Sequence, residues 1–296
     1  MTSPTAVRRT AGIVGAGTMG AGVAQCLVEA GYRVVVYDPV PGALDDGRSR
    51  LAAGLRTRAL LRPGPPVEPA GIGERMCWTA DPEPLADAEF VIECGPERVP
   101  VKRDILATLD ATCAVTTVIA SNTSAIPITR IAGWVRNPER VLGMHFMNPA
   151  PLKDTVEVIR ALHTSDETIA AARELLAAMG KEAVLVADAA GFVSNRVLML
   201  TVNEAAFLVH ERTAPAREVD QVFRRCFGHP MGPLETADLI GLDVILDSLD
   251  VLYEHYRDPK FRPCPLLAQL VYAGHHGRKS GRGFHTYRTA TGSRPG

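Results

Sequence analysis

Apolar and polar positions alternate in blocks along the first two-thirds of the chain. Six short runs rich in Val, Ile and other apolar residues are typical of buried strands. They cover residues 11–15, 33–37, 90–94, 115–121, 140–146 and 182–187. Stretches with helical spacing lie between these runs, for example at 98–109 and 165–179. The alternation predicts an α/β domain in which helices cover both faces of a doubly wound parallel sheet.

The pattern changes near residue 188. Downstream of it, helical spacing predicts four helices and one short strand, over residues 193–212, 215–227, 233–257, 264–273 and 283–287. We therefore expect residues 1–188 to form the α/β domain and residues 189–296 to form a smaller all-α domain. The Pro- and Gly-rich segment 62–71 is interpreted as a loop of the first domain, because the strand pattern resumes after it.

The first predicted strand leads into a glycine-rich turn, GAGTMG at residues 15–20, which opens a helix. This context indicates a dinucleotide-binding Rossmann domain. Gly15 permits the tight turn, Gly17 lets the backbone approach a pyrophosphate, and Gly20 lets the helix pack closely on the strand. The phosphates would then lie at the helix N-terminus, where N–H groups favour anions. The loop residues assigned to cofactor binding are Gly15, Gly17, Thr18, Met19 and Gly20.

An acidic residue ends the second predicted strand. Asp38 stands eighteen residues after Gly20, where a carboxylate can bind both ribose hydroxyls and would repel the 2′-phosphate of NADP. NAD is therefore the expected cofactor. The alternative, a glycine-rich turn that binds no ligand, is disfavoured because the strand, the helix and Asp38 all occur in the required order.

A histidine stands near the end of the predicted strand 140–146. His145 is followed by an Asn-Pro-Ala-Pro turn at residues 148–151, which can reverse the chain and return Glu157 towards it. Ligands of open α/β sheets bind at the carboxyl ends of the strands, and free imidazole has the near-neutral pKa that suits a general base. A nearby carboxylate would orient the ring and stabilise its protonated form. The alternative is a packed core histidine, because its neighbours are apolar.

Composition narrows the classes of function. The 296 residues are enough for two domains, and the formal net charge of -1 gives no reason to expect nucleic acid or a membrane surface as a partner. No apolar run reaches the ~18 residues of a membrane-spanning helix, and the N-terminus lacks the pattern of a signal peptide. The six cysteines form no CxxC pair, so we expect reduced thiols, no metal site and a cytoplasmic location.

Seven strings occur in the order found in one enzyme family: GIVGAGTMGAGVAQ, VIECGPE, SNTS, HFMNPAP, GFVSNR, MGPLETADLIGLD and KSGRGFHTY. Together they resemble the 3-hydroxyacyl-CoA dehydrogenase family, which includes the 3-hydroxybutyryl-CoA dehydrogenases, over nearly the whole chain except residues 42–75. The resemblance implies an NAD-binding Rossmann domain followed by a helical domain that usually forms a homodimer. It also implies hydride transfer between NAD and C3 of an acyl thioester.

The resemblance also assigns catalytic roles to individual residues. It implies that His145 is the base, that Glu157 is its carboxylate partner and that Ser124 orients the substrate. Asn195 would complete the site from the helical domain. From the residues alone, Ser124 could instead cap the helix expected near Ala125, and Asn195 could be a local partner of the backbone.

Three further residues are assigned to the cofactor site. The resemblance places Glu97 and Lys102 near the nicotinamide ribose, and Asn122, within the SNTS string, is assigned to the same site. From the residues alone, Glu97 and Lys102 could be an ordinary solvated ion pair near the start of a helix.

Two segments depart from the family pattern. Residues 152–155 read Leu-Lys-Asp-Thr, where family members often carry apolar residues and then a lysine. This extra polarity near Glu157 could suit a substrate with an additional hydroxyl, or it could be a solvent-facing turn. The segment expected to meet the CoA phosphates is usually lysine-rich, but here it carries Arg48, Arg50, Arg56, Arg58 and Arg62. Arginines can bind CoA phosphates in a bidentate manner, or they can dock an acidic acyl carrier protein.

The string from MGPLETADLIGLD to DPKFRPCPLL is also similar to carrier-protein-linked relatives in polyketide pathways. The favoured prediction is therefore oxidation of a glyceryl group on an acyl carrier protein, towards hydroxymalonyl or methoxymalonyl extender units. The alternative in the same class is a short 3-hydroxyacyl-CoA such as (S)-3-hydroxybutyryl-CoA, a substrate of fatty acid metabolism. The alternative of another class is a non-catalytic NAD-binding structural protein.

Overall fold

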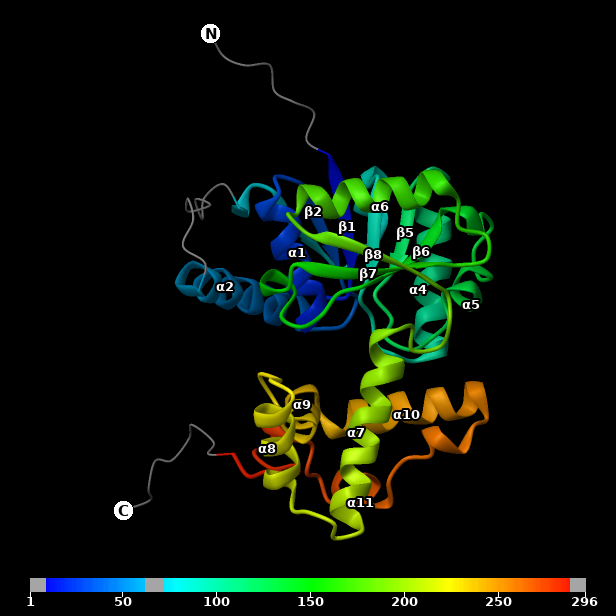
Figure 1. Ribbon diagram of the computed structural model, residues 1–296. Helices are drawn as coiled ribbons and strands as arrows, with labels where there is room; N and C mark the ends of the chain where they lie inside the picture. The colour runs from blue at the N-terminus through cyan, green and yellow to red at the C-terminus, as the bar shows by residue number, and fades with distance from the viewer. Residues whose placement is uncertain (1–8, 62–71, 288–296) are drawn as a thin grey trace. The chain divides into compact units, whose positions relative to one another are not determined.

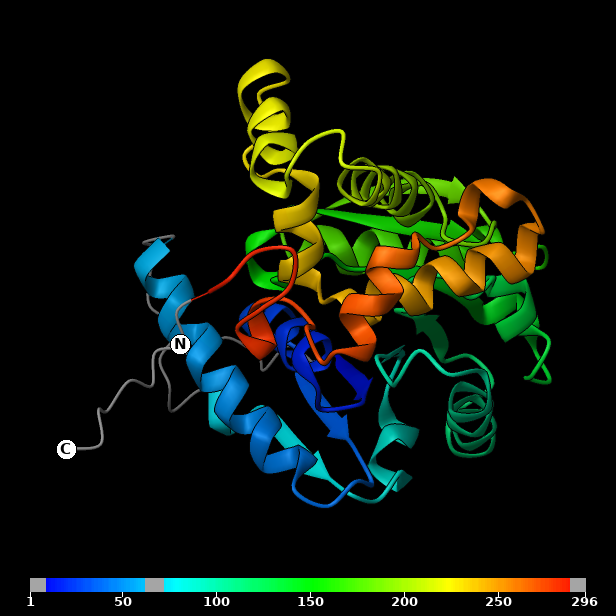
Figure 2. The ribbon, with the colours of Figure 1, turned by 90° about the horizontal axis from the view of Figure 1, so that it is seen from below.

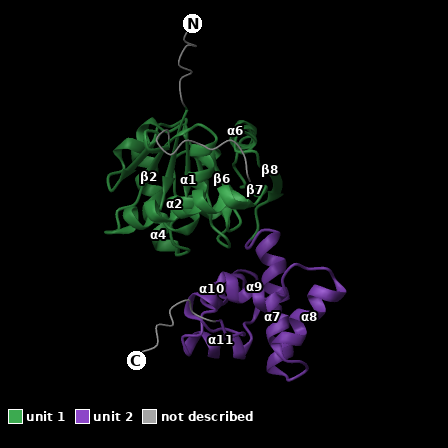
Figure 3. Cartoon of the chain, turned by 90° about the vertical axis from the view of Figure 1, so that its left-hand side faces the viewer, with its two compact units in different colours: residues 1–189 green, residues 190–296 purple. Residues whose placement is uncertain are grey.

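The computed structural model describes residues 9–61 and 72–287. The chain splits into two compact units, residues 1–189 and 190–296 (Figure 3). The segment 62–71, interpreted above as a loop, lies outside the described residues, and so does Arg62. Within the described ranges, no helix is both long enough and apolar enough to cross a membrane.

The described part of the first unit is built on one eight-stranded sheet with the order β3-β2-β1-β4-β5-β6-β7-β8 (Figure 1). Its strands are β1 Thr10–Val14, β2 Arg33–Tyr37, β3 Met76–Thr79, β4 Phe90–Glu93, β5 Val118–Ser121, β6 Val141–His145, β7 Thr155–Arg160 and β8 Glu182–Ala187. The first six strands pair in parallel, in the order 3-2-1-4-5-6 of a doubly wound dinucleotide-binding domain. The predicted α/β Rossmann fold is confirmed.

Strand β7 breaks the parallel pattern. It pairs antiparallel with β6, and the register places Gly143 opposite Ile159 and His145 opposite Glu157. Strand β8 then pairs in parallel with β7. The apolar pattern predicted neither β3 nor β7. Strand β3 is only half-buried, and β7 carries a buried glutamate where an apolar strand would carry an aliphatic residue.

Helices lie on both sides of this sheet (Figure 1). They are α1 Thr18–Glu29, α2 Ala43–Leu61, α4 Val99–Thr112, α5 Ile128–Ala132 and α6 Asp166–Ala178. The buried residues of α1 and α6 share one apolar core with one face of the strands, including Ile13 and Ile92. Figure 2 shows α2 as a single long helix. Only Gly47 and Leu51 of α2 are buried, so its helical pattern in the sequence is weak.

The second unit has its own apolar core, formed by helices in its described part (Figure 3). The helices are α7 Ser194–His210, α8 Ala216–Cys226, α9 Pro233–Ile240, α10 Leu242–Tyr256 and α11 Pro265–Tyr272. This all-α architecture agrees with the predicted fold class, with two local differences.

The expected helix 233–257 is two helices, because Gly241 adopts a φ of 113° that L side chains rarely reach. Gly241 ends α9 through a hydrogen bond to Ala237. The expected strand 283–287 forms only isolated bridges. The Asp238 carboxylate accepts the N–H groups of Phe284 and His285, so this backbone pairs with a side chain instead of a neighbouring strand.

Candidate active site

A cleft opens at the carboxyl ends of β1 and β4, where the strand order reverses. Its volume is about 830 Å³, and its lining includes Gly15, Gly17, Thr18, Met19 and Asp38. Ligands of doubly wound sheets bind at this kind of switch point. The size and position of the cleft therefore fit a dinucleotide such as NAD.

The glycine loop is shaped as its sequence predicts. Gly15 has a φ of 96°, which favours glycine in this tight turn. A Cβ atom on Gly20 would overlap the carbonyl oxygen of Gly15, whereas a Cβ atom on Gly17 would meet no protein atom within 4 Å. Gly20 thus permits close packing between helix and loop. Gly17 leaves open space next to the first turn of α1, where a pyrophosphate can approach the backbone.

Asp38 stands at the rim of the same cleft, directly after β2. One carboxylate oxygen accepts the N–H of Ala16 at 2.8 Å, and the other accepts the N–H of Val40 at 3.0 Å. These bonds orient the carboxylate, and each oxygen has a second lone pair that can accept a ribose hydroxyl. The geometry therefore fits the expected ribose contact.

The β6–β7 hairpin brings His145 and Glu157 together. The two residues are direct cross-strand partners, and Nδ1 of His145 lies 3.1 Å from Oε2 of Glu157. His145 is 4% exposed and Glu157 is 7% exposed, so the pair is shielded from water and weakly screened. The turn between them includes Asn148 and a short 3₁₀ segment, Ala150–Leu152. The expected return of Glu157 to the histidine is present in the structure.

Ser124 approaches the other side of the same imidazole. Its hydroxyl lies 3.2 Å from Nε2 of His145, and it belongs to the loop that follows β5. The N–H groups of Ser124 and Ala125 both donate to Oε1 of Glu97. The structure thus gathers His145, Glu157, Ser124 and Glu97 in one connected group of polar side chains.

Lys102 is not part of a solvated pair. It is 1% exposed, and its Nζ lies 2.9 Å from both carboxylate oxygens of Glu93 and 3.6 Å from Oε2 of Glu97. Burial alone would lower the pKa of Lys102, but the carboxylates of Glu93 and Glu97 outweigh burial and raise this pKa. The solvated-pair alternative is therefore wrong, and the main partner of Lys102 is a residue that the sequence patterns did not single out.

Asn122 connects the ends of three neighbouring strands. Its N–H donates to the Glu93 carbonyl, and its side-chain oxygen accepts the N–H of Phe146 at 2.8 Å. These contacts hold the loop after β5 against the residue that follows His145. A contact between Asn122 and NAD stays a prediction.

Asn195 belongs to the second unit. It is the second residue of α7, as expected for the first turn of a helix. Its contribution to the site of His145 stays a prediction from the family resemblance.

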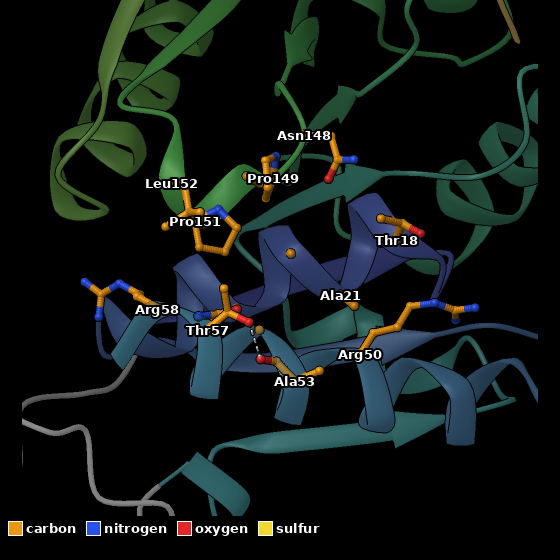
Figure 4. Close-up of a pocket in the computed structure, with 14 residues that line it drawn as sticks. Thr18, Ala21, Arg50, Ala53, Thr57, Arg58, Asn148, Pro149, Pro151 and Leu152 are labelled. Carbon is orange, nitrogen blue, oxygen red and sulfur yellow. Dashed lines mark hydrogen bonds between the residues drawn. The ribbon is translucent and has the colours of Figure 1, made fainter. Parts of the chain in front are cut away.

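A separate groove in the first unit runs between α1, α2 and the proline turn (Figure 4). Its volume is about 340 Å³, and its lining includes Thr18, Arg50, Arg58, Pro149 and Leu152. Arg50 also lines the dinucleotide cleft. Of the four arginines of this segment that the structure describes, Arg50 and Arg58 therefore border a space that a ligand can enter.

Lys153 and Asp154 are both exposed. Asp154 lines a small polar cleft together with Glu29, Arg58 and Lys181, and strand alternation turns it to the opposite face from Thr155 and Glu157. The extra carboxylate thus lies on the face away from His145. This geometry favours the solvent-facing interpretation of Asp154 over a contact with the reacting acyl group.

Two family models match the chain in succession. Residues 10–189 match the model described as 3-hydroxyacyl-CoA dehydrogenase, NAD binding domain. Residues 191–287 match the model described as 3-hydroxyacyl-CoA dehydrogenase, C-terminal domain.

Individual relatives agree with these matches. The chain is 44% identical over 279 residues to the probable 3-hydroxybutyryl-CoA dehydrogenase of Bacillus subtilis (strain 168), a match that covers 94% of this chain and 97% of that protein. It is 36% identical to the 3-hydroxyadipyl-CoA dehydrogenase of Escherichia coli (strain K12), over 95% of this chain and 59% of that protein. The crystal structure of (S)-3-hydroxybutyryl-CoA dehydrogenase from Ralstonia eutropha is similar with a TM-score of 0.88 and 39% identity, over 95% of this chain and 100% of that chain.

Proposed function

The chain belongs to the 3-hydroxyacyl-CoA dehydrogenase family and uses NAD, and we propose that it oxidises the 3-hydroxyl group of a short acyl-CoA. The substrate proposed is (S)-3-hydroxybutyryl-CoA. The observation that carries this proposal is the buried contact between Nδ1 of His145 and Glu157. The second ring nitrogen of His145, Nε2, faces the hydroxyl of Ser124. A base held in this way is what the oxidation of a secondary alcohol requires.

The reaction converts a 3-hydroxyacyl thioester into a 3-ketoacyl thioester and releases one proton to the protein. NAD supplies the hydride acceptor when it is bound. The open backbone at Gly17 would admit its pyrophosphate, and Asp38 would accept the ribose hydroxyls. The remaining task for the protein is to take the proton from the substrate hydroxyl.

His145 is the group proposed to take that proton. If Nδ1–H donates to Glu157, the neutral ring presents the lone pair of Nε2 on the side where Ser124 lies. A substrate hydroxyl within hydrogen-bond reach of Nε2 can then transfer its proton during oxidation. Ser124 would share a hydrogen bond with the same hydroxyl and orient it towards the base.

Glu157 is proposed to fix the ring and to stabilise its charged form. Because it accepts from Nδ1, it selects the tautomer that leaves Nε2 able to accept a proton. Its low exposure strengthens the attraction to the imidazolium that forms. Asn195 is proposed to complete the substrate site from the second unit, as the resemblance implies.

CoA is proposed as the thioester carrier in place of the acyl carrier protein favoured from the sequence. The relatives described above are named for CoA thioesters, and the carrier-protein prediction finds no support among them. Arg50 and Arg58 border the groove of Figure 4, where guanidinium groups would bind CoA phosphates. The polyketide assignment is therefore replaced by the alternative.

The test is an NADH assay with purified protein and two substrates in parallel. The proposal predicts robust NADH formation with (S)-3-hydroxybutyryl-CoA and little with glyceryl on an acyl carrier protein. Turnover of the carrier-bound glyceryl group alone would overturn the choice of CoA. Failure of both substrates, together with normal NADH binding, would favour the non-catalytic structural alternative.

Homodimerisation through the second unit and a cytoplasmic location remain predictions. The dimer rests on the family resemblance. It can be checked by sedimentation of the purified chain, for which a dimer mass is expected.

A further inference from the structure

A buried carboxylate that the proposed reaction does not use lies beneath the cofactor cleft. Glu93 ends β4 and is 0% exposed. We propose that Glu93 is a positioning residue, which fixes Lys102 and thereby sets Glu97 and the loop of Ser124 for cofactor binding. The proposal rests on the assignment of Glu97 and Lys102 to the NAD site, and not on the identity of the acyl group.

The first step is the set of donors around Glu93. Its Oε1 accepts the N–H of Gly95 at 2.6 Å, and its Oε2 accepts the hydroxyl of Ser121 at 2.6 Å. Both oxygens also accept from Nζ of Lys102 at 2.9 Å. A buried carboxylate with this many donors is held in one position. Gly95, one of the donors, lines the dinucleotide cleft.

The second step is the effect on Lys102. Lys102 belongs to α4, and its long side chain is almost entirely buried. Its ammonium group also donates to the Gly95 carbonyl at 3.3 Å. An ammonium in this position needs a full counter-charge, because desolvation would otherwise favour its neutral form. Glu93 supplies that charge at contact distance, whereas Glu97 lies farther away at 3.6 Å.

The third step leads to the reacting group. Glu97 is held on one side by the ammonium of Lys102. On the other side its Oε1 accepts the hydroxyl of Thr123 and the backbone N–H groups of Ser124 and Ala125. The orientation of the Ser124 loop thus depends on Glu97, and the orientation of Glu97 depends on a lysine that Glu93 fixes.

The test variant is Glu93→Gln, which keeps the size of the side chain and removes its charge. NADH binding is titrated by fluorescence with the full-length protein. The proposal predicts that Kd for NADH rises by about tenfold, as expected for loss of a charge-assisted hydrogen bond. An unchanged Kd would overturn the proposal. If the wild-type chain itself bound no NADH, the assignment of the cofactor site would be wrong.

A matched control separates positioning from general loss of stability. Asp110 also lies on the α4 side of the sheet and pairs with the buried Arg140 at 2.7 Å, an interaction that no cleft residue shares. Asp110→Asn should lower the thermal midpoint while Kd for NADH stays within about twofold of wild type. Equal losses of NADH affinity in both variants would assign Glu93 a merely structural role.

A double variant covers the case in which Glu93→Gln does not fold. Glu93→Gln with Lys102→Met removes both charges, so no unpaired buried charge remains. The proposal predicts that this protein folds and binds NADH about tenfold more weakly than wild type. Wild-type affinity in the double variant would show that neither residue positions the cofactor site and would overturn the proposal.

Discussion

Two histidine–carboxylate pairs lie among the described residues, one in each unit, and they differ in their surroundings. His145 and Glu157 face each other across two antiparallel strands at 3.1 Å. His285 and Asp220 join the C-terminal segment of the second unit to α8 at 2.7 Å. By distance alone, the second pair is the shorter one. The distance within a pair therefore does not identify a catalytic base.

The second pair has the contacts of a structural clamp. The Asp220 carboxylate also accepts the N–H groups of Leu234 and Glu235, in the first turn of α9. These bonds satisfy amide groups that have no partner within the helix. The backbone N–H of His285 donates to the Asp238 carboxylate, which also accepts the backbone N–H of Phe284. Asp220 thus holds a helix start and a chain segment together.

The first pair has the contacts that the proposed base requires. Glu157 lies in the middle of a strand, and the second nitrogen of His145 faces the hydroxyl of Ser124 in the loop that follows β5. The useful criterion is therefore the set of groups around each pair, which are backbone N–H groups of α9 at Asp220 and a loop hydroxyl at His145. In the first unit the second nitrogen of His145 faces the Ser124 hydroxyl, where the proposed substrate hydroxyl would lie.

The largest expected effect comes from His145→Gln. The substitution removes the proposed base, so kcat for (S)-3-hydroxybutyryl-CoA should fall by about a thousandfold, while NADH binding stays close to wild type. The matched control is His285→Gln, for which kcat should change by less than about twofold and the unfolding free energy should fall by roughly 1–3 kcal/mol. The measurements are initial rates and denaturant unfolding. Comparable losses of turnover in both variants would contradict the distinction between a catalytic pair and a structural pair.

The next effect concerns the two carboxylates. Glu157→Gln should lower kcat by about a hundredfold, because the ring loses its orienting acceptor and the stabilisation of its charged form. Asp220→Asn should leave kcat of the remaining folded protein unchanged and should lower the unfolding free energy by roughly 3 kcal/mol. Rates normalised to folded protein distinguish the two results. A catalytic loss in Asp220→Asn at full stability would contradict the clamp interpretation.

The smallest expected effect concerns the hydroxyl of Ser124 beside His145. Ser124→Ala should lower kcat/KM by about tenfold, because the substrate hydroxyl loses one orienting hydrogen bond. Nε2 of His145 stays able to accept the proton. Ser124→Thr retains the hydroxyl and should recover much of the loss. A wild-type kcat/KM in the Ser124→Ala variant would contradict a role of Ser124 in orienting the substrate.

Much of the cofactor cleft could be predicted from the sequence, because its determinants are local. The GAGTMG turn, the helix that it opens and Asp38 lie close together in the chain, and each has a backbone reason for its position. The doubly wound fold and the use of NAD are confirmed. The return of Glu157 was also predictable, since a proline turn separates it from His145.

Other features depend on contacts that a linear pattern does not contain. Glu93 appears in the sequence as one residue of an apolar strand, and its importance comes from Lys102 and Ser121, which reach it from other elements. Strand β7 was missed because a buried glutamate interrupts its apolar run. The break at Gly241 had a local signal, a glycine between two helical stretches, which the length of the apolar pattern concealed.

The central claim is that His145 and Glu157 act as one unit, and a double-mutant cycle tests it most directly. The measured quantity is kcat/KM for (S)-3-hydroxybutyryl-CoA in His145→Gln, Glu157→Gln and the double variant. If Glu157 acts only through His145, the double variant should match His145→Gln within about threefold. If the two losses multiply instead, Glu157 acts independently of the histidine and the claim is contradicted.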